Sequence, residues 1–211
     1  MVMEATIGGT KRHLHELSVG LHARGWPVEV ACPRVRAEAH GDTSFWDDLE
    51  GSGVSLRAMP MERRVASRVN LEAIGALARV IREASPRIDV VHAHSAIGGA
   101  VARLAVLAAA PLGRRPVVVY TPHGFAFLDG SPARRRAFLV VERVLGLATD
   151  RLIGVSPTEG EVAWRRRVVP RERVVAIPNG IDPASMPSPD DGARARAEEG
   201  WGDGIDAGSM P

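Results

Sequence analysis

The stretch DVVHAHSAIGGAVARLAVLAAAPLGRRPVVVYTPHG, residues 89–124, contains two β-branched runs on either side of one run of small apolar residues. Residues 89–93 and 116–121 are predicted strands, and the second is apolar enough to be buried on both faces. Residues 97–110 between them are predicted to form a helix. A strand, a helix and a second strand in this order are typical of a parallel sheet with a crossover helix.

The same alternation continues on both sides of this stretch. Further strands are expected at residues 2–6, 28–32, 54–59, 151–155 and 173–177, and further helices at residues 10–24, 71–81, 132–148 and 157–166. About seven strands separated by helices predict an α/β, Rossmann-like fold, with a mainly parallel sheet and helices on both faces. Ligands bind such sheets at the carboxyl ends of the strands, so the loops after the strands are the candidate sites.

Composition indicates an ordinary soluble domain with a tail. The chain has 211 residues, of which 45% are hydrophobic and 25% are charged, which excludes disorder or coiled coil as its main content. Residues 187–211 are acidic and rich in glycine and proline. We therefore expect one domain at residues 1–186, and at residues 187–211 a tail or the truncated start of a second domain.

Charge and cysteine content limit the partners and the compartment. The net charge is +2 and aromatic residues make up only 4%, so we expect no nucleic-acid partner. Cys32 is the single cysteine, which excludes an internal disulfide and fits a reducing compartment. The most apolar stretch, residues 97–113, contains Arg103 and is too short for a good membrane span. A cytoplasmic protein is expected.

Two glycines stand between the first predicted strand and the first predicted helix. Backbone N–H groups at Gly8, Gly9 and Thr10 would favour an anion such as a diphosphate, and glycine lets a ligand approach the backbone closely. The motif is neither G-x-G-x-x-G nor a P-loop, so nicotinamide and Mg-ATP binding lose support. A tight turn without a ligand is the alternative.

Histidines lie in the loops after two central strands. His92 and His94 alternate along an extended segment, so both side chains point to the same side, and we expect one to be buried and the other to face a pocket. A zinc site would need further ligands, which are scattered in the sequence, so no metal is expected. His123 follows the strand at residues 116–121, where it can contact a substrate hydroxyl or phosphate. A structural histidine at the sheet edge is the alternative.

The remaining loops carry turn and capping residues. Ser156 is predicted to be a helix N-cap, with Glu159 completing a capping box, and no G-x-S-x-G motif indicates a nucleophilic serine. Asn179 begins an Asn-Gly turn. The arginine runs at residues 134–136 and 165–167 are either solvated helix faces or a surface for anionic lipid or a phosphorylated acceptor.

Five of these segments, in this order, resemble the N-terminal domain of family 4-type retaining glycosyltransferases of the GT-B fold. They are EATIGGT (4–10), DVVHAH (89–94), YTPHG (120–124), DRLIGVS (150–156) and VAIPNGID (175–182). The resemblance implies a normally two-domain architecture with the active site in the cleft between the domains. The N-terminal domain would mainly hold the acceptor and the C-terminal domain a nucleotide-sugar donor.

The resemblance also implies roles for particular residues. His123 would be catalytic, near the transferred sugar or the acceptor hydroxyl, and Gly8, Gly9 and Thr10 would approach the donor diphosphate. The expected acceptor-binding residues are His92, His94, Ser95, Thr121, Ser156 and Asn179. No metal or cofactor is expected beyond the nucleotide diphosphate sugar, which is the donor substrate. The acceptor would be a glycan or a lipid-linked hydroxyl compound, with peripheral contact at the inner membrane face through the arginine runs.

Two departures from the family pattern set further expectations. The first strand looks short before Glu4, and the Glu-x7-Glu segment of the family's second domain does not occur in residues 187–211. We therefore expect the isolated chain to be inactive without a C-terminal domain in trans, and the strand-end residues Phe125 and Phe127 to be exposed. The alternatives are a non-catalytic module that binds a glycan, a lipid phosphate or a protein, and a sugar-nucleotide epimerase of related architecture.

Overall fold

The computed structural model describes residues 1–4, 8–35, 43–64, 67–110 and 115–180. The chain divides into two compact units, Met1–Pro178 and Asn179–Pro211. Only Asn179 and Gly180 of the second unit are described. The expected boundary after residue 186 therefore lies outside the described residues.

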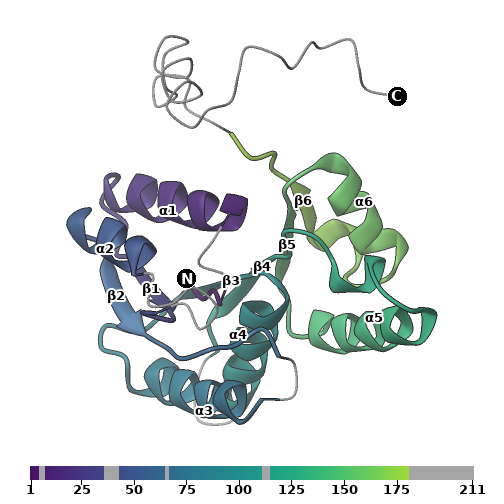
Figure 1. The fold of residues 1–211 in the computed structure, drawn as a ribbon, viewed down its shortest axis with the longest axis horizontal. Helices are drawn as coiled ribbons and strands as arrows, with labels where there is room; N and C mark the ends of the chain where they lie inside the picture. The colour runs from purple at the N-terminus through teal and green to yellow at the C-terminus, as the bar shows by residue number, and fades with distance from the viewer. Residues whose placement is uncertain (5–7, 36–42, 65–66, 111–114, 181–211) are drawn as a thin grey trace, which may run out of the picture. The chain divides into compact units, whose positions relative to one another are not determined.

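The first unit is built on parallel strands (Figure 1). They are β1 (Glu29–Cys32), β2 (Ser55–Ala58), β3 (Val90–His94), β4 (Val117–Thr121), β5 (Arg151–Gly154) and β6 (Val174–Ala176). β1 pairs with β2, and β3, β4, β5 and β6 pair in that order, each pair parallel. The predicted α/β fold with a mainly parallel sheet is confirmed.

Val2 takes the place of a seventh strand between the two groups. It forms isolated parallel bridges with Ala31 of β1 and Ala93 of β3. The N–H of Val2 donates to the carbonyl of His92 at 2.9 Å, and the N–H of His94 donates to the carbonyl of Val2 at 2.9 Å. The described residues thus contain six strands, where about seven were expected. The strand order reverses between Val2 and β3, which is the point where open α/β sheets bind ligands.

Helices cover both faces of the sheet, as expected. They are α1 (Gly8–His22), α2 (Ser44–Gly51), α3 (Arg68–Glu83), α4 (Ala96–Ala109), α5 (Pro132–Gly146) and α6 (Pro157–Arg165). Val2 packs in one apolar core with α3 and α4, while the next residue, Met3, packs in a second core with α1 and α2. Successive residues of an extended chain point to opposite faces, so these two cores lie on opposite sides of the sheet. Helix α2 was not predicted from the sequence.

Phe125 and Phe127 contradict the expectation of exposure. Each is only 3% exposed, and their ring centroids are 4.7 Å apart. After β4 the chain forms a short 3-10 helix, Ala126–Leu128, which carries Phe127 into the larger core, against which Phe138 of α5 also packs. Burial of two aromatic rings is worth several kcal/mol. The expectation was wrong because the domain itself covers these rings.

A buried ion pair connects α4, α5 and β4. Arg103 is fully buried in α4, and its Nη1 donates to Oε2 of Glu142 in α5 at 3.0 Å. The hydroxyl of Tyr120 in β4 donates to Oε1 of Glu142 at 3.0 Å, and the Arg103 guanidinium lies 3.9 Å from the Tyr120 ring centroid. Burial first, and then Glu142, raise the pKa of Tyr120, so its hydroxyl stays protonated and can donate. Among the described residues, no helix has the length and apolar character needed to cross a membrane.

Candidate functional site

Four of the predicted site residues meet at the carboxyl ends of β3 and β4. The parallel register pairs His94 with Thr121. Nε2 of His92 lies 2.8 Å from Oγ1 of Thr121, and Nδ1 of His94 lies 3.2 Å from Nε2 of His123. The rings of His92 and His94 are 4.0 Å apart between centroids, so these two side chains do share one side of β3. Sequence spacing predicted this edge correctly.

A fourth histidine, His13 of α1, joins the cluster and was missed from the sequence. Its ring centroid lies 4.8 Å from that of His123 and 5.6 Å from that of His94. His13 is distant in the sequence from the other three histidines, as expected of further candidate ligands, but the fold brings it beside them. The sequence could have indicated His13, because it lies one turn after Thr10 in a helix that begins at the same sheet edge.

The imidazoles of His92, His94 and His123 are neutral at physiological pH. Burial lowers the pKa of His92 to about 3 and that of His94 well below its usual value, and neighbouring positive charges add to both effects. Burial and then His13 lower the pKa of His123 to about 4. A neutral imidazole donates or accepts a hydrogen bond but does not neutralise a phosphate. The site therefore suits a hydroxyl group better than a diphosphate.

Two residues at this edge, one of them in the cluster, have a positive φ that is costly for side chains other than glycine. Ser95 follows β3 with φ of 62°, and His123 follows β4 with φ of 53°. The surrounding structure holds Ser95, because its hydroxyl contacts the Glu4 carboxylate and its N–H donates to the carbonyl of Thr121 at 2.9 Å. Strain of this kind gathers at binding sites, which supports a functional role for this edge.

Glu159 fixes the loop that carries His123. The N–H groups of Gly124 and Val155 both donate to the Glu159 carboxylate, and the N–H of Glu159 donates to Oγ of Ser156 at 3.1 Å. The predicted N-cap at Ser156 is thus confirmed, and Glu159 reaches back as expected but accepts from the N–H of Val155, the residue before the N-cap, in place of the Ser156 N–H of a standard capping box. The Glu159 carboxylate also connects the loop after β4 to the loop after β5, a contact that the sequence did not predict. The expected contact of Ser156 with an acceptor stays a prediction.

Gly8, Gly9 and Thr10 form the first turn of α1. A Cβ atom added at Gly9 would meet no atom within 4 Å, so protein packing does not require glycine there. The first N–H groups of a helix have no partner within the helix and favour anions. By contrast, the first turn of α4 already holds a carboxylate, because the N–H of Gly98 donates to Oε2 of Glu4 at 2.7 Å.

Asn179 is exposed and belongs to the second compact unit. Its expected contact with an acceptor therefore stays a prediction.

Comparison with known proteins decides the family. The model of Glycosyltransferase Family 4 matches residues 7–185. This chain belongs to glycosyltransferase family 4. The resemblance drawn from the five sequence segments is confirmed, and family membership favours a glycosyltransferase over an epimerase of related architecture.

Two curated relatives of this family 4 chain share about a third of the aligned residues. The chain is 33% identical over 133 residues to EpsD of Bacillus subtilis (strain 168), covering 63% of this chain and 31% of EpsD. It is 33% identical over 100 residues to the UDP-Gal:alpha-D-GlcNAc-diphosphoundecaprenol alpha-1,3-galactosyltransferase of Escherichia coli. That match covers 46% of this chain and 24% of the relative. The matched segments thus cover under a third of the length of either relative.

Solved structures share the fold. The crystal structure of Anabaena Alr3699/HepE in complex with UDP and glucose superposes with a TM-score of 0.66 at 19% identity, over 94% of this chain and 48% of HepE. A glycosyltransferase from Rickettsia africae ESF-5 superposes with a TM-score of 0.61 at 15% identity, over 95% and 48% of the two chains. The family 4 chain therefore corresponds to about half the length of these proteins.

Proposed function

We propose that this domain is the acceptor-side half of a retaining glycosyltransferase. The reaction transfers a sugar from a nucleotide diphosphate sugar to a hydroxyl group of a glycan or lipid-linked acceptor. One observation carries this proposal: the neutral cluster of His92, His94, Thr121 and His123 lies at the strand edge where Rossmann-like sheets bind ligands. The relative from Escherichia coli is named for a UDP-Gal donor and a diphosphoundecaprenol-linked acceptor, which supports the choice of substrate class.

The proposed roles follow from the charge state of the groups. His123, held neutral and mounted on a backbone fixed by Glu159, orients a sugar or acceptor hydroxyl by a hydrogen bond. The N–H groups of the first turn of α1 approach the donor diphosphate, whose negative charge grows as the bond to the sugar breaks. A C-terminal domain supplies the main donor contacts and closes the site.

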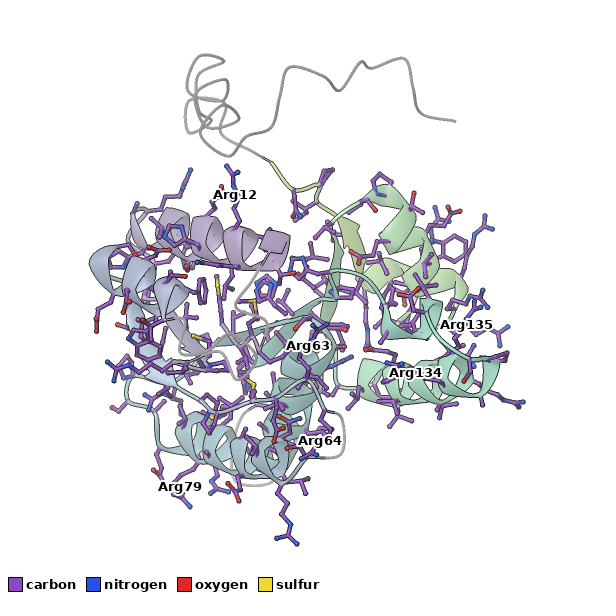
Figure 2. All side chains as sticks on the ribbon, in the orientation of Figure 1. Arg12, Arg63, Arg64, Arg79, Arg134 and Arg135 are labelled. Atoms are coloured by element: carbon purple, nitrogen blue, oxygen red, sulfur yellow. The ribbon has the colours of Figure 1, made fainter. Side chains whose placement is uncertain are left out.

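Helix α5 suits a contact with anionic lipid, where a lipid-linked acceptor would reside. Arg134, Arg135 and Arg136 are exposed near its start, and Figure 2 labels the first two. Exposed apolar side chains follow on the same helix and just after it, at Val140, Val141, Val144 and Leu147. Basic and apolar side chains on one exposed helix favour binding at a membrane surface.

The test of the proposal is sugar transfer by a reconstituted two-domain protein. The chain is joined to a C-terminal family 4 half and assayed with UDP-sugars and a polyprenyl diphosphate-linked sugar. We expect nucleotide release that depends on acceptor, with kcat/KM reduced about 10- to 1,000-fold by His123→Ala. His22→Ala, on the exposed end of α1, is the control and should leave the rate unchanged.

Two outcomes would count against the proposal. One is sugar binding without any nucleotide release, which would favour the non-catalytic module. The other is an unchanged kcat/KM in the His123→Ala protein. The chain without a C-terminal half is expected to release no nucleotide above background.

A further inference from the structure

The rings of His94 and His123 form a hydrogen-bonded pair at the carboxyl ends of β3 and β4, which lie side by side (Figure 1). Nδ1 of His94 lies 3.2 Å from Nε2 of His123. The ring planes differ by 23° and the centroids are 5.5 Å apart, so the two rings meet edge to edge with these nitrogens between them. In such a pair one ring must donate an N–H and the other must accept with a lone pair.

His94 has no surface with which to touch a ligand. Its exposed fraction is 0%, whereas His123 is only partly buried. Because Nε2 of His123 already bonds His94, Nδ1 of His123 is the ring nitrogen left for a ligand. Whether this Nδ1 carries a proton or a lone pair depends on which ring donates within the pair.

The surroundings of His94 indicate that it is the donor. Burial lowers the pKa of both histidines, so each ring is neutral and holds one proton on one of its two nitrogens. Nε2 of His94 is buried and makes no hydrogen bond with any described residue. A proton on this Nε2 would be a buried N–H without an acceptor, which is the rarest kind of unpaired polar group in folded proteins. The proton therefore belongs on Nδ1 of His94, where His123 accepts it.

We propose that His94 is a positioning residue, which donates from Nδ1 to Nε2 of His123 and thereby places the proton of His123 on Nδ1. His123 then offers a ligand an N–H donor and no lone pair. This inference rests on the proposed function, in which His123 contacts a sugar or acceptor oxygen. It makes His123 a donor to that oxygen and excludes it as the base that removes the proton of the acceptor hydroxyl.

Nitrogen NMR on the full chain reads the two tautomers directly. The chain is labelled with ¹⁵N, and long-range ¹H–¹⁵N correlation spectra are recorded at about pH 8, where histidines with the usual pKa of about 6.5 are neutral as well. Protonated and unprotonated ring nitrogens resonate in separate regions, so each ring shows which nitrogen holds its proton. We expect the proton on Nδ1 in both His94 and His123. A proton on Nε2 of either ring would overturn the proposal.

Two substitutions of His94 separate the hydrogen bond from packing. His94→Asn keeps an amide N–H near the position of Nδ1, and His94→Leu keeps a similar size without any donor. We expect His123 to retain its proton on Nδ1 in His94→Asn and to hold it on Nε2, the form that an unpartnered histidine favours, in His94→Leu. His22→Asn, which changes an exposed residue of α1, is the control and should leave the His123 signals unchanged.

An unchanged His123 tautomer in folded His94→Leu would contradict the proposal. Circular dichroism establishes that each variant is folded, and if His94→Leu does not fold, the spectra of the parent and of His94→Asn decide. A shift of the His123 proton to Nε2 in folded His94→Asn would also count against a donor at this position.

Sugar transfer by the two-domain protein gives a second measurement. His94→Leu should lower kcat/KM about 10- to 100-fold, because His123 then presents a lone pair where the ligand needs a donor, and His94→Asn should retain most of the activity. Equal kcat/KM in His94→Leu and the parent would overturn the positioning role. The NMR spectra require no turnover, so a parent protein that transfers no sugar would contradict the proposed function and leave the tautomers to be decided by NMR.

Discussion

The buried pair of Arg103 and Glu142 is where a single substitution should most affect this domain. Both side chains are almost completely enclosed, with relative exposures of 0% and 6%. Glu142→Gln keeps the shape of the side chain and an acceptor for the Tyr120 hydroxyl, but it removes the negative charge. The Arg103 guanidinium then remains charged and buried without a counter-charge, because arginine is not deprotonated in proteins.

The expected loss follows from this burial. Removing one partner of a buried ion pair costs about 3–5 kcal/mol of unfolding free energy. In a domain of this size each kcal/mol lowers Tm by about 2–4 °C, so Glu142→Gln should lower Tm by about 6–20 °C. The exposed pair of Glu161 and Arg165 gives a matched control, since its side chains are 49% and 66% exposed. Glu161→Gln should cost less than about 1 kcal/mol.

Thermal and urea unfolding, followed by circular dichroism, measure both variants. A double variant tests the cause, because Arg103→Met combined with Glu142→Gln removes the unpaired buried charge. We expect this double variant to be more stable than Glu142→Gln alone, with a coupling free energy of about 0.5–3 kcal/mol. If the losses of the two single variants simply add, or if Glu142→Gln costs no more than Glu161→Gln, the reasoning about the buried charge is refuted.

Three further predictions concern the strand edge. Gly9→Ala should leave the unfolding free energy unchanged or raise it by up to about 1 kcal/mol, because the added methyl group meets no atom within 4 Å. It should still lower kcat/KM for the donor in the two-domain protein. Unchanged kcat/KM would argue against a donor diphosphate that lies close to the backbone at Gly9. Glu159→Gln should weaken the hydrogen bond from the N–H of Gly124 and so lower kcat/KM for sugar transfer, while Tm changes little relative to that of Glu161→Gln. If Glu159 had a purely structural role, the substitution would lower Tm and leave kcat/KM unchanged. In the folded state the pKa of His92 is lowered from 6.5 to about 3, so between about pH 3 and pH 6.5 the unfolded chain binds more protons than the folded chain. The free energy of unfolding is therefore greatest above about pH 6.5 and should fall as the pH drops below it, by up to about 1.4 kcal/mol per pH unit. Urea unfolding at about pH 7 and about pH 5 measures this change, and its absence in the parent would contradict neutral burial.

Local patterns in the sequence determined the secondary structure and the edge where the site lies. Alternating β-branched and helical runs predicted the strands around residues 89–124, because a strand buried on both faces must be continuously apolar. Ser156 and Glu159 predicted a helix start, because a capping box acts between residues three positions apart. The positions of His92, His94 and His123 after strands were equally local information, since parallel strands end at one sheet edge.

Tertiary structure alone decided which distant groups meet. His13 reaches His123 only because α1 docks over the sheet edge, and Arg103 meets Glu142 across 39 positions of sequence because α4 and α5 pack together. The burial of Phe127 likewise depends on the core beneath it. Such contacts leave no periodic signal in the chain. They are selected by close packing and by the cost of leaving a buried charge or ring nitrogen unpaired, both of which exist only once the helices and sheet have assembled.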